Sequence, residues 1–442
     1  MKRKIYNKLV QWKHERNGTS ALLIEGARRI GKSYIAEEFA RNEYESYILI
    51  DFSKSPARVK SWFDDYLEDV DTLLQNIQLH YKKTLTPRKS LIIFDEVQKC
   101  PRAREAIKAL VADHRFDYLE TGSLISIKKN VEDIVIPSEE ESLDMYPMDF
   151  EEFLWAQGIP DEVIGKFTSC LEELKPIPES IHERMFQLLL QYTIIGGMPA
   201  VVENFTQNKN VALSLSMQRN LLRSYEDDMV KYASASDKSI IRECFRSIPK
   251  QLGKENKKFQ YSVVRKGTTA SRFRGALQWI EDAGIIRRCH NLSITGLPLD
   301  GNAIPDIFKV YMSDTGLFVA MLEDGTQSDI LQGNLSGYKG AIFENLVADM
   351  LGKQGRKLYY FHKNSGLEVD FVIRMQGQCV LMEVKATTGN TKSSKTILAH
   401  PEKYGIAHCI KFGRYNIGRT GGIITMPLYA AAFLSSVQIP DV

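Results

Sequence analysis

The stretch that most constrains this chain is residues 26–33, Gly-Ala-Arg-Arg-Ile-Gly-Lys-Ser, which fits the pattern G-x-x-x-x-G-K-[ST] of a phosphate-cradling loop. An apolar run at 21–25 predicts a buried strand before it, and residues 34–41 predict a helix after it, as the motif requires. Lys32 would reach the β- and γ-phosphates, and Ser33 would hold Mg²⁺. The alternative is a chance glycine turn before a helix, but the flanking strand and helix favour a nucleotide site.

Two acids close the apolar run at residues 90–94. Asp95 at the end of a strand would lie opposite the phosphate loop and hold Mg²⁺ through water, and Glu96 would polarise the attacking water. The alternative for this pair is a solvated turn. At the next strand end, Thr121 and Ser123 would sense the γ-phosphate by hydrogen bonding, or else cap a turn.

Apolar strands alternate with helices through the first 123 residues, which predicts an α/β fold with a mainly parallel sheet covered on both faces. The expected strands are 21–25, 47–52, 90–96 and 116–123. The expected helices are 1–20, 34–41, 56–80 and 102–114. The length of 442 residues allows two or three domains, at about 150 residues each.

The composition of the chain limits the cellular compartment and the binding partners that we expect. Six cysteines without a Cys-x-x-Cys pair indicate free thiols in a reducing cytoplasm rather than disulfides or a zinc site. No apolar segment follows the basic N-terminus, and the stretch 421–434 is too short to cross a bilayer, so we expect a cytoplasmic protein without a membrane partner. The net charge of +3 is too small to indicate nucleic-acid binding by the whole chain.

Several segments together resemble a bacterial and archaeal family of AAA-type P-loop ATPases, whose members carry a C-terminal domain of unknown function with a nuclease-like core. The segments are GARRIGKS, LIIFDE, LETGS, MYPMDFEEFLWAQG, IIGGMPAVV, FKVYMSDTGL, GAIFENLVADML and LEVDFVI. The resemblance implies that Lys32 and Ser33 are the phosphate-loop pair, Asp95 and Glu96 the acidic pair and Ser123 the sensor. The nucleotide-binding set expected on this basis is Gly26, Arg28, Gly31, Lys32, Ser33, Tyr34, Asp95 and Ser123.

The chain departs from that family between Ser123 and Tyr146. Many relatives have a Gly-Arg pair there, whereas residues 137–141 read Pro-Ser-Glu-Glu-Glu, so no arginine finger can be named for a homo-oligomer. From 132 to 152 there are nine acidic residues and no Lys or Arg, which predicts an acidic surface stretch that ends the nucleotide domain.

Residues 241–290 are basic, with twelve Lys/Arg against four Asp/Glu. Residues 256–290 read as helix–turn–helix with a loop at Gly267, a second helix from Thr269 to 282 and a wing strand from 285. The side chains that would contact DNA phosphates are Lys257, Lys258, Lys266, Arg272, Arg274, Arg287 and Arg288. The alternative is a winged-helix linker with a solvated basic face.

The C-terminal region combines a helix at 340–351 with two strands at 368–373 and 380–386. Residues two apart share a face of a strand, so Glu383 and Lys385 would project together, with Asp370 on the neighbouring strand. Two acids with a lysine suit Mg²⁺ and an activated water, although E-x-K is also common on surface strands. The arrangement resembles the PD-(D/E)xK nuclease core, which places Glu344, Asp370 and Glu383 as metal ligands and Lys385 beside them.

The sequence thus predicts a P-loop NTPase sheet at 1–150, a helical lid-like region at 151–240, a winged-helix-like region at 241–334 and a restriction-endonuclease-like α/β domain at 335–442. The expected function is Mg²⁺-dependent ATP hydrolysis coupled to a nuclease-like domain that acts on DNA. The expected catalytic residues are Lys32, Glu96, Asp370, Glu383 and Lys385. The alternative is a nucleotide-switched binding or regulatory protein whose nuclease-like domain is an inactive scaffold for a partner.

Overall fold

The computed structural model describes residues 1–123, 136–231, 235–254, 257–266, 270–334, 338–386 and 391–440. The chain forms two compact units. The first unit comprises residues 2–146 with 282–284, and the second comprises residues 1, 147–281 and 285–442. Among the described residues, no helix is long and apolar enough to cross a membrane.

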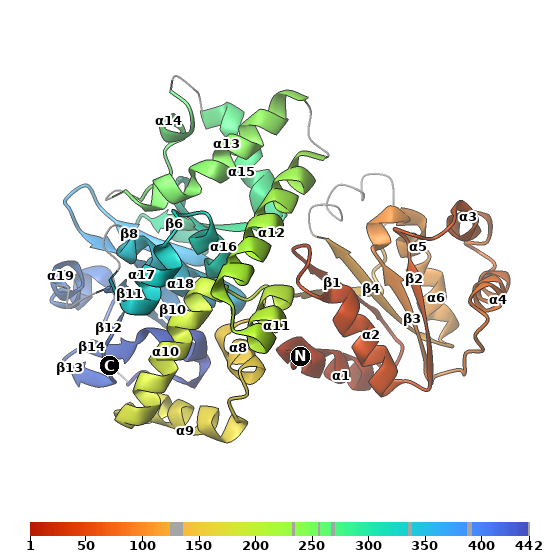
Figure 1. Cartoon of the computed structure of the whole chain (residues 1–442), viewed down its shortest axis with the longest axis horizontal. Coiled ribbons are helices and arrows are strands. Elements are labelled where there is room, and N and C mark those ends of the chain that lie inside the picture. Colours follow the sequence, from red (N-terminus) through yellow and green to blue (C-terminus); the bar gives the residue numbers. More distant parts are fainter. Residues whose placement is uncertain are drawn as a thin grey trace. The chain divides into compact units, whose positions relative to one another are not determined.

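The first unit is built on a five-stranded sheet in the order β2-β3-β4-β1-β5, with every neighbouring pair parallel (Figure 1). This confirms the predicted parallel α/β sheet. The strands are β1 (Ala21–Gly26), β2 (Ser46–Asp51), β3 (Ser90–Asp95), β4 (Asp117–Ser123) and β5 (Glu140–Asp144). The helices are α1 (Lys4–Arg16), α2 (Lys32–Glu43), α3 (Ala57–Asp65), α4 (Val70–Tyr81), α5 (Pro101–Glu105) and α6 (Ile107–Asp113).

Apolar side chains alternate between the two faces of this sheet because successive strand residues point to opposite sides. One face packs on α3, α4 and α6 through a core cluster that includes Phe63, Ile77, Phe94 and Leu110. The helix α2 contacts β1, β2, β3 and β4 on the sheet, and α1 packs beside α2. Both faces are therefore covered, as the apolar strands predict.

Helix boundaries differ from the prediction at 56–80. The structure has two helices there, because Asp69 accepts from Thr72 N at 3.1 Å and caps the start of α4. The predicted helix at 102–114 is likewise divided into α5 and α6.

The acidic segment after residue 136 is only in part the predicted surface stretch. Residues Glu140–Asp144 form β5, which pairs with β1 at the edge of the sheet. The Glu140 side chain is only 3% exposed and accepts from Arg104 Nη2 at 2.6 Å and Nε at 2.7 Å. Glu141 accepts from Ser20 Oγ at 2.8 Å. The Glu140 charge is therefore buried and paired, whereas Glu141 stays partly exposed, and the part of the stretch at 132–135 lies outside the described residues.

The second unit begins with helices, as predicted for the middle of the chain. These are α8 (Phe150–Ala156), α9 (Asp161–Glu172), α10 (Glu179–Ile195), α11 (Pro199–Asn208), α12 (Val211–Lys231), α13 (Ala235–Leu252), α14 (Tyr261–Val264) and α15 (Ala270–Asp282). In α15, Phe273, Leu277 and Ile280 are buried as the helical spacing predicts. The predicted turn at Gly267 and the start of the second helix at Thr269 lie outside the described residues.

The rest of the second unit contains two mixed sheets, in the orders β7-β6-β8-β9 and β10-β11-β12-β14-β13. The strands are β6 (Ile286–Leu292), β7 (Ala303–Met312), β8 (Leu358–His362), β9 (Glu368–Val369), β10 (Phe371–Met375), β11 (Gln378–Val384), β12 (His408–Gly413), β13 (Gly418–Thr420) and β14 (Ile423–Pro427). The helices are α16 (Thr315–Ala320), α17 (Thr326–Gln332), α18 (Lys339–Lys353), α19 (Lys392–Leu398) and α20 (Pro401–Tyr404), and a 3₁₀ segment, η3 (Leu428–Ser436), ends the described fold. β6 and β7 thus share a sheet with strands that come after residue 335.

A buried polar contact explains two of the segments that carry the resemblance. Gly197 N donates to Asp314 Oδ2 at 2.6 Å, and Asp314 Oδ1 accepts from Leu317 N at 2.9 Å, which caps α16. A Cβ on Gly196 would lie 2.2 Å from Asp314 Oδ1. The Gly-Gly pair and the Ser-Asp-Thr-Gly turn therefore fit together, and a side chain at Gly196 would separate them.

Candidate functional site

The loop at residues 26–31 connects β1 to α2 at the carboxyl edge of the first sheet. Gly31 precedes α2 with φ of 94°, in the left-handed region that favours glycine. A Cβ on Gly26 would lie 2.2 Å from the carbonyl oxygen of Met145. Both motif glycines are therefore required by the backbone, which turns directly into the N-terminus of a helix, where anions are stabilised.

Lys32 lies at the first position of α2, and its ammonium folds back over the loop. Nζ donates to the carbonyls of Gly26 at 3.0 Å and Ala27 at 2.7 Å. Burial lowers the pKa of Lys32 from 10.5 to about 8, although the Glu96 carboxylate opposes this shift and the Arg28 charge adds to it. The loop thus holds a buried cation whose charge is incompletely compensated.

Asp95 is brought beside the loop, as predicted. Its Oδ1 accepts from Ser33 Oγ at 2.7 Å and also from Thr121 Oγ1. A serine hydroxyl and a carboxylate at one point are hard oxygen donors, which Mg²⁺ prefers, and Mg²⁺ takes few protein ligands when phosphates supply the others. Ser33 and Asp95 therefore fit a magnesium ion, and Thr121 orients the carboxylate.

The remaining predicted residues surround this pair. Glu96 follows Asp95 with φ of 55° and ψ of 46°, its amide donates to Thr121 Oγ1 at 3.4 Å, and its carboxylate accepts from Gln98 Nε2. The buried Ser123 hydroxyl has no hydrogen-bond partner among the described residues. Tyr34 is 55% exposed on α2. The structure thus gathers the predicted nucleotide set at one edge of the sheet.

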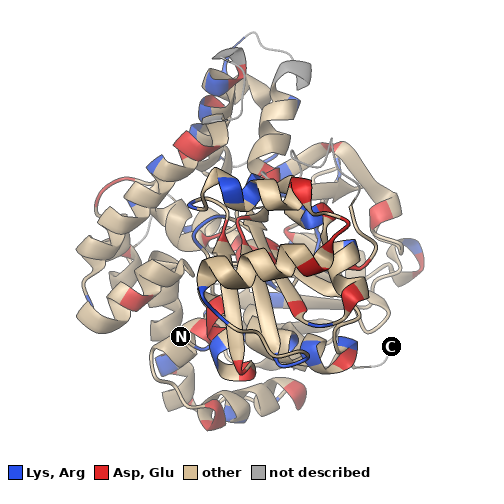
Figure 2. Cartoon of the chain, turned by 90° about the vertical axis from the view of Figure 1, so that its right-hand side faces the viewer, with Lys and Arg blue, Asp and Glu red and all other residues tan. Residues whose placement is uncertain are grey.

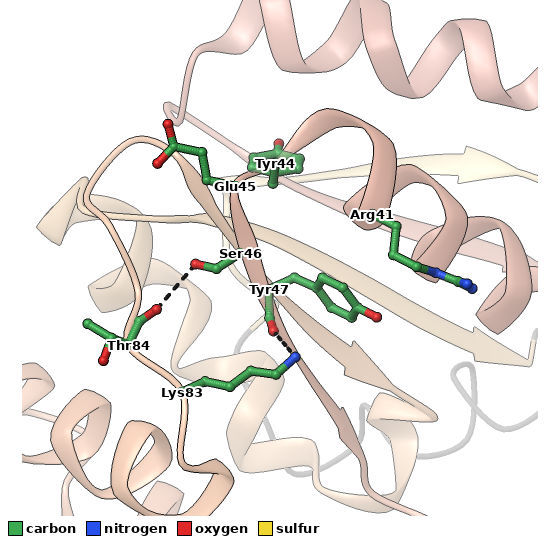
Figure 3. A pocket seen from close by; sticks show the side chains of 7 residues that line it. All are labelled: Arg41, Tyr44, Glu45, Ser46, Tyr47, Lys83 and Thr84. Atoms are coloured by element: carbon green, nitrogen blue, oxygen red, sulfur yellow. Dashed lines mark hydrogen bonds between the residues drawn. The ribbon is translucent and has the colours of Figure 1, made fainter.

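A pocket of about 370 Å³ lies at the amino-terminal edge of the same sheet (Figure 3). It is lined by Arg41, Tyr44, Glu45, Ser46, Tyr47, Lys83 and Thr84. Lys83 Nζ donates to the carbonyl of Tyr47 at 2.8 Å, and Ser46 Oγ donates to that of Thr84 at 3.3 Å. Because β2 begins at Ser46, this pocket lies at the amino end of the strand, away from the phosphate loop.

In the second unit, the four residues predicted from the nuclease resemblance lie close together. Lys385 directly follows β11, which ends at Val384 and not at 386 as predicted, and its Nζ is 2.6 Å from Glu383 Oε2. Asp370 Oδ2 accepts from Val384 N at 2.8 Å, between these two residues. Burial and then the charge of Glu344 raise the pKa of Asp370 to about 6.

Glu344 has cationic partners that the sequence analysis missed. Lys309 of β7 lies 3.1 Å from both Glu344 Oε1 and Glu368 Oε1, and Lys257 is paired with Glu344 Oε2. Tyr311 also donates to Oε1. Burial by itself would raise the pKa of Glu344, but the two ammonium groups lower it to about 2. We call Glu344, Lys257, Lys309 and Tyr311 the lysine cluster.

The carboxylates of this region do not fit a divalent cation in the arrangement observed. Both oxygens of Glu344 already accept from an ammonium group, and Glu383 is engaged by Lys385 and by Ser394. Within the described ranges, no group of three or more His, Cys, Asp or Glu side chains is arranged to hold a metal ion. The metal set of Glu344, Asp370 and Glu383 stays a prediction.

Much of the basic charge at 241–290 is paired within the fold. Arg274 lies 2.8 Å from Asp306, Arg288 lies 2.9 Å from Glu281, and Lys257 belongs to the lysine cluster. Arg287 lies against Gly352 of α18. Lys266 is exposed, Lys258 is half-buried, and the Arg272 side chain lies outside the described residues.

In the first unit both signs of charge are interspersed on the face that Figure 2 shows.

Comparison with protein families matches three segments of the chain. Residues 18–154 match an AAA domain. Residues 186–328 and 339–430 match two domains of unknown function, DUF8612 and DUF4143. No curated protein matches the chain at the sequence level. The chain therefore carries an AAA-type P-loop ATPase domain followed by two domains of unknown function.

Three solved structures have a distant similarity to the chain. A Walker-type ATPase of Pyrococcus abyssi is 14% identical, with a TM-score of 0.44 over 72% of this chain and 95% of its own. DnaA from Aquifex aeolicus bound to AMPPCP is 11% identical, with a TM-score of 0.29 over 63% and 87%. Drosophila ORC bound to DNA is 10% identical, with a TM-score of 0.27 over 69% and 90%.

Proposed function

We propose that this chain, whose first unit is an AAA-type P-loop ATPase domain, binds ATP with Mg²⁺ and hydrolyses it. The observation that carries the proposal is the hydrogen bond of 2.7 Å between Ser33 Oγ and Asp95 Oδ1, next to the buried Lys32. The direct test is phosphate release from ATP by the purified full chain with Mg²⁺ and with EDTA. Absence of Mg²⁺-dependent binding and release would overturn it.

Each residue of the nucleotide site has its own proposed role in phosphoryl transfer. Amides at the start of α2 and the Lys32 ammonium bind the phosphates, and Ser33 with Asp95 holds the metal. Bound Mg²⁺ neutralises charge on the phosphate oxygens. In this proposal Glu96 accepts a proton from the attacking water, and Ser123 donates to a phosphate oxygen. Gln98 fixes the Glu96 carboxylate through the hydrogen bond from its amide.

The lowered pKa of Lys32 predicts that ATP affinity falls at alkaline pH. Above about pH 8 the ligand-free protein loses the Lys32 proton, whereas the complex needs the charged ammonium, so binding must take up a proton. The dissociation constant for Mg·ATP is then expected to rise by up to about tenfold per pH unit above 8. Calorimetric titrations at several pH values in buffers of different ionisation enthalpy measure both effects.

The lowered pKa of Lys32 also determines whether the ligand-free protein becomes more or less stable as pH rises. Between about pH 8 and 10.5 the unfolded chain binds a proton at Lys32 that the folded chain does not, so this group makes the ligand-free protein more stable as pH rises. Lys32→Arg is the control, because a guanidinium stays charged throughout this range. An affinity for ATP that is flat from pH 7 to 10 in the original chain would contradict the prediction.

We propose further that nucleotide hydrolysis acts through the second unit, and two roles for that unit follow from the sequence. The order α18, β10, β11, α19, β12 with Glu344, Asp370, Glu383 and Lys385 in proximity supports a nuclease-like domain that acts on DNA. The lysine cluster favours the other role, a nucleotide-switched binding protein with an inactive nuclease-like scaffold, because Lys309 is 1% exposed and already compensates Glu344.

The scaffold role predicts that supercoiled plasmid stays intact when it is incubated with the full chain, ATP and either Mg²⁺ or Mn²⁺. The expectation rests on the occupied oxygens of Glu344, which leave too few carboxylate ligands for a metal-activated water. Gel electrophoresis over several hours is the measurement. Nicking that is lost in Asp370→Ala, but kept in the surface variant Asp306→Ala, would contradict the scaffold role and support the nuclease.

A further inference from the structure

Arg3 connects the phosphate loop to the segment that follows β5. Its Nη1 donates to the carbonyl of Ile30 at 3.0 Å, and its Nη2 donates to the carbonyl of Tyr146 at 2.7 Å. The residue is 8% exposed, although it lies just before α1 at the start of the chain. We infer that Arg3 is a positioning residue of the nucleotide site, a role that rests on the ATP binding proposed above.

The contact with Ile30 acts on the amide that follows it. In a trans peptide the carbonyl and the next N–H point in opposite directions, so a carbonyl fixed on Arg3 aims the Gly31 N–H to the other side of that peptide. Gly31 lies immediately before α2, where backbone N–H groups stabilise phosphate charge. Arg3 therefore holds the peptide plane through which the loop presents this donor.

The contact with Tyr146 connects the loop, through Arg3, to the residues that follow β5. Met145 N donates to the carbonyl of Glu25 at 2.8 Å, which continues the pairing between β1 and β5. A Cβ on Gly26 would meet both the Met145 carbonyl, at 2.2 Å, and Ile30 Cδ1, at 2.6 Å. The start of the loop thus lies against Met145, the Ile30 side chain lies against the start of the loop, and Arg3 connects Ile30 to Tyr146.

Arginine suits this place better than lysine would. The guanidinium is planar and presents several N–H groups in a fixed fork, so that two carbonyls are held at a set distance from one another. A lysine ammonium is a point charge on a flexible stem and would hold one carbonyl without fixing the other. The inference therefore predicts graded effects of substitution.

The test compares Arg3→Ala, Arg3→Lys and the exposed α1 variant Lys8→Ala in the full chain. Dissociation constants for Mg·ATP and Mg·ADP are measured by calorimetry, together with kcat and KM for hydrolysis and the melting temperature. We expect about tenfold weaker binding in Arg3→Ala, a smaller loss in Arg3→Lys and none in Lys8→Ala. Millimolar ethylguanidinium is expected to restore ATP binding to Arg3→Ala but not to Lys32→Ala.

The outcomes separate this inference from the proposed function. If the original chain binds no Mg·ATP, the proposed function fails. If it binds Mg·ATP and Arg3→Ala binds equally well, only the role of Arg3 fails. Weak binding in Arg3→Ala that ethylguanidinium does not restore, with a lowered melting temperature, would assign Arg3 to fold stability and overturn its positioning role. Should Arg3→Ala not fold, Arg3→Lys carries the comparison through its KM and kcat.

Discussion

Replacement of Lys32 by alanine is expected to reduce ATP hydrolysis by at least about 100-fold. The ammonium is the buried cation of the phosphate loop and lies at the first position of α2, where the β- and γ-phosphates would meet it. Negative charge on these phosphates increases toward the transition state, so the loss of a fixed cation affects turnover more than ground-state binding. Phosphate release under saturating ATP measures the effect.

The fold is expected to tolerate this substitution. Burial lowers the pKa of Lys32, which means that the ligand-free protein loses free energy of folding by keeping this charge inside. Alanine removes that cost, so the melting temperature without nucleotide should stay the same or rise. Lys108→Ala on the exposed side of α6 is the matched control. Undiminished hydrolysis in Lys32→Ala would show that the catalysis lies elsewhere.

The core strands of the first unit are predictable because a parallel sheet covered on both faces makes them continuous apolar runs. Ser90–Asp95 is buried at every position, and Asp95 and the following Glu96 mark the strand end at which Asp95 meets Ser33. Motif spacing therefore predicted the strand and also the two side chains, Ser33 and Asp95, that meet at its end. The sheet order could not be predicted, because it depends on which strands pair and not on their own composition.

The strand β5 could not be predicted, because its sequence Glu-Glu-Ser-Leu-Asp has no apolar run. It forms because β1 offers a free edge and because Arg104 compensates the buried Glu140 charge. Arg3 was missed for a related reason. Its carbonyl partners are 27 and 143 residues away, and a backbone carbonyl leaves no mark in a side-chain pattern.

In the second unit, the partners of Glu344 in the lysine cluster could not be predicted for the same reason, because they are distant in the sequence. The alternation Glu-Val-Lys predicts that Glu383 and Lys385 project together, and the two side chains form an ion pair although Lys385 lies just past the end of β11. Lys309 and Lys257 meet Glu344 from 35 and 87 residues away, so no local spacing could reveal them. One local signal did exist, since Lys309 stands among apolar residues of the strand Ala303–Met312, where a lysine needs a buried partner.

Replacement of Glu96 by glutamine is expected to lower turnover by about 100-fold to 1,000-fold while Mg·ATP binding is retained. Glutamine has nearly the same size and can still accept from Gln98, but it cannot take a proton from the attacking water. Glutamate and glutamine have similar backbone preferences, so we expect Glu96→Gln to keep the left-handed backbone conformation of this turn. Single-turnover hydrolysis with pre-bound ATP isolates the chemical step.

The competing view of Glu96 as part of a solvated turn predicts unchanged turnover in the same variant. Glu105→Gln, which alters an acid of α5 paired with Arg102, is the control for general charge effects. Since the Asp95 carboxylate already accepts from Ser33 and Thr121, we do not expect it to substitute for the missing base. Turnover that falls together with ATP affinity would assign Glu96 to binding, whereas a fall in turnover alone identifies it as the general base.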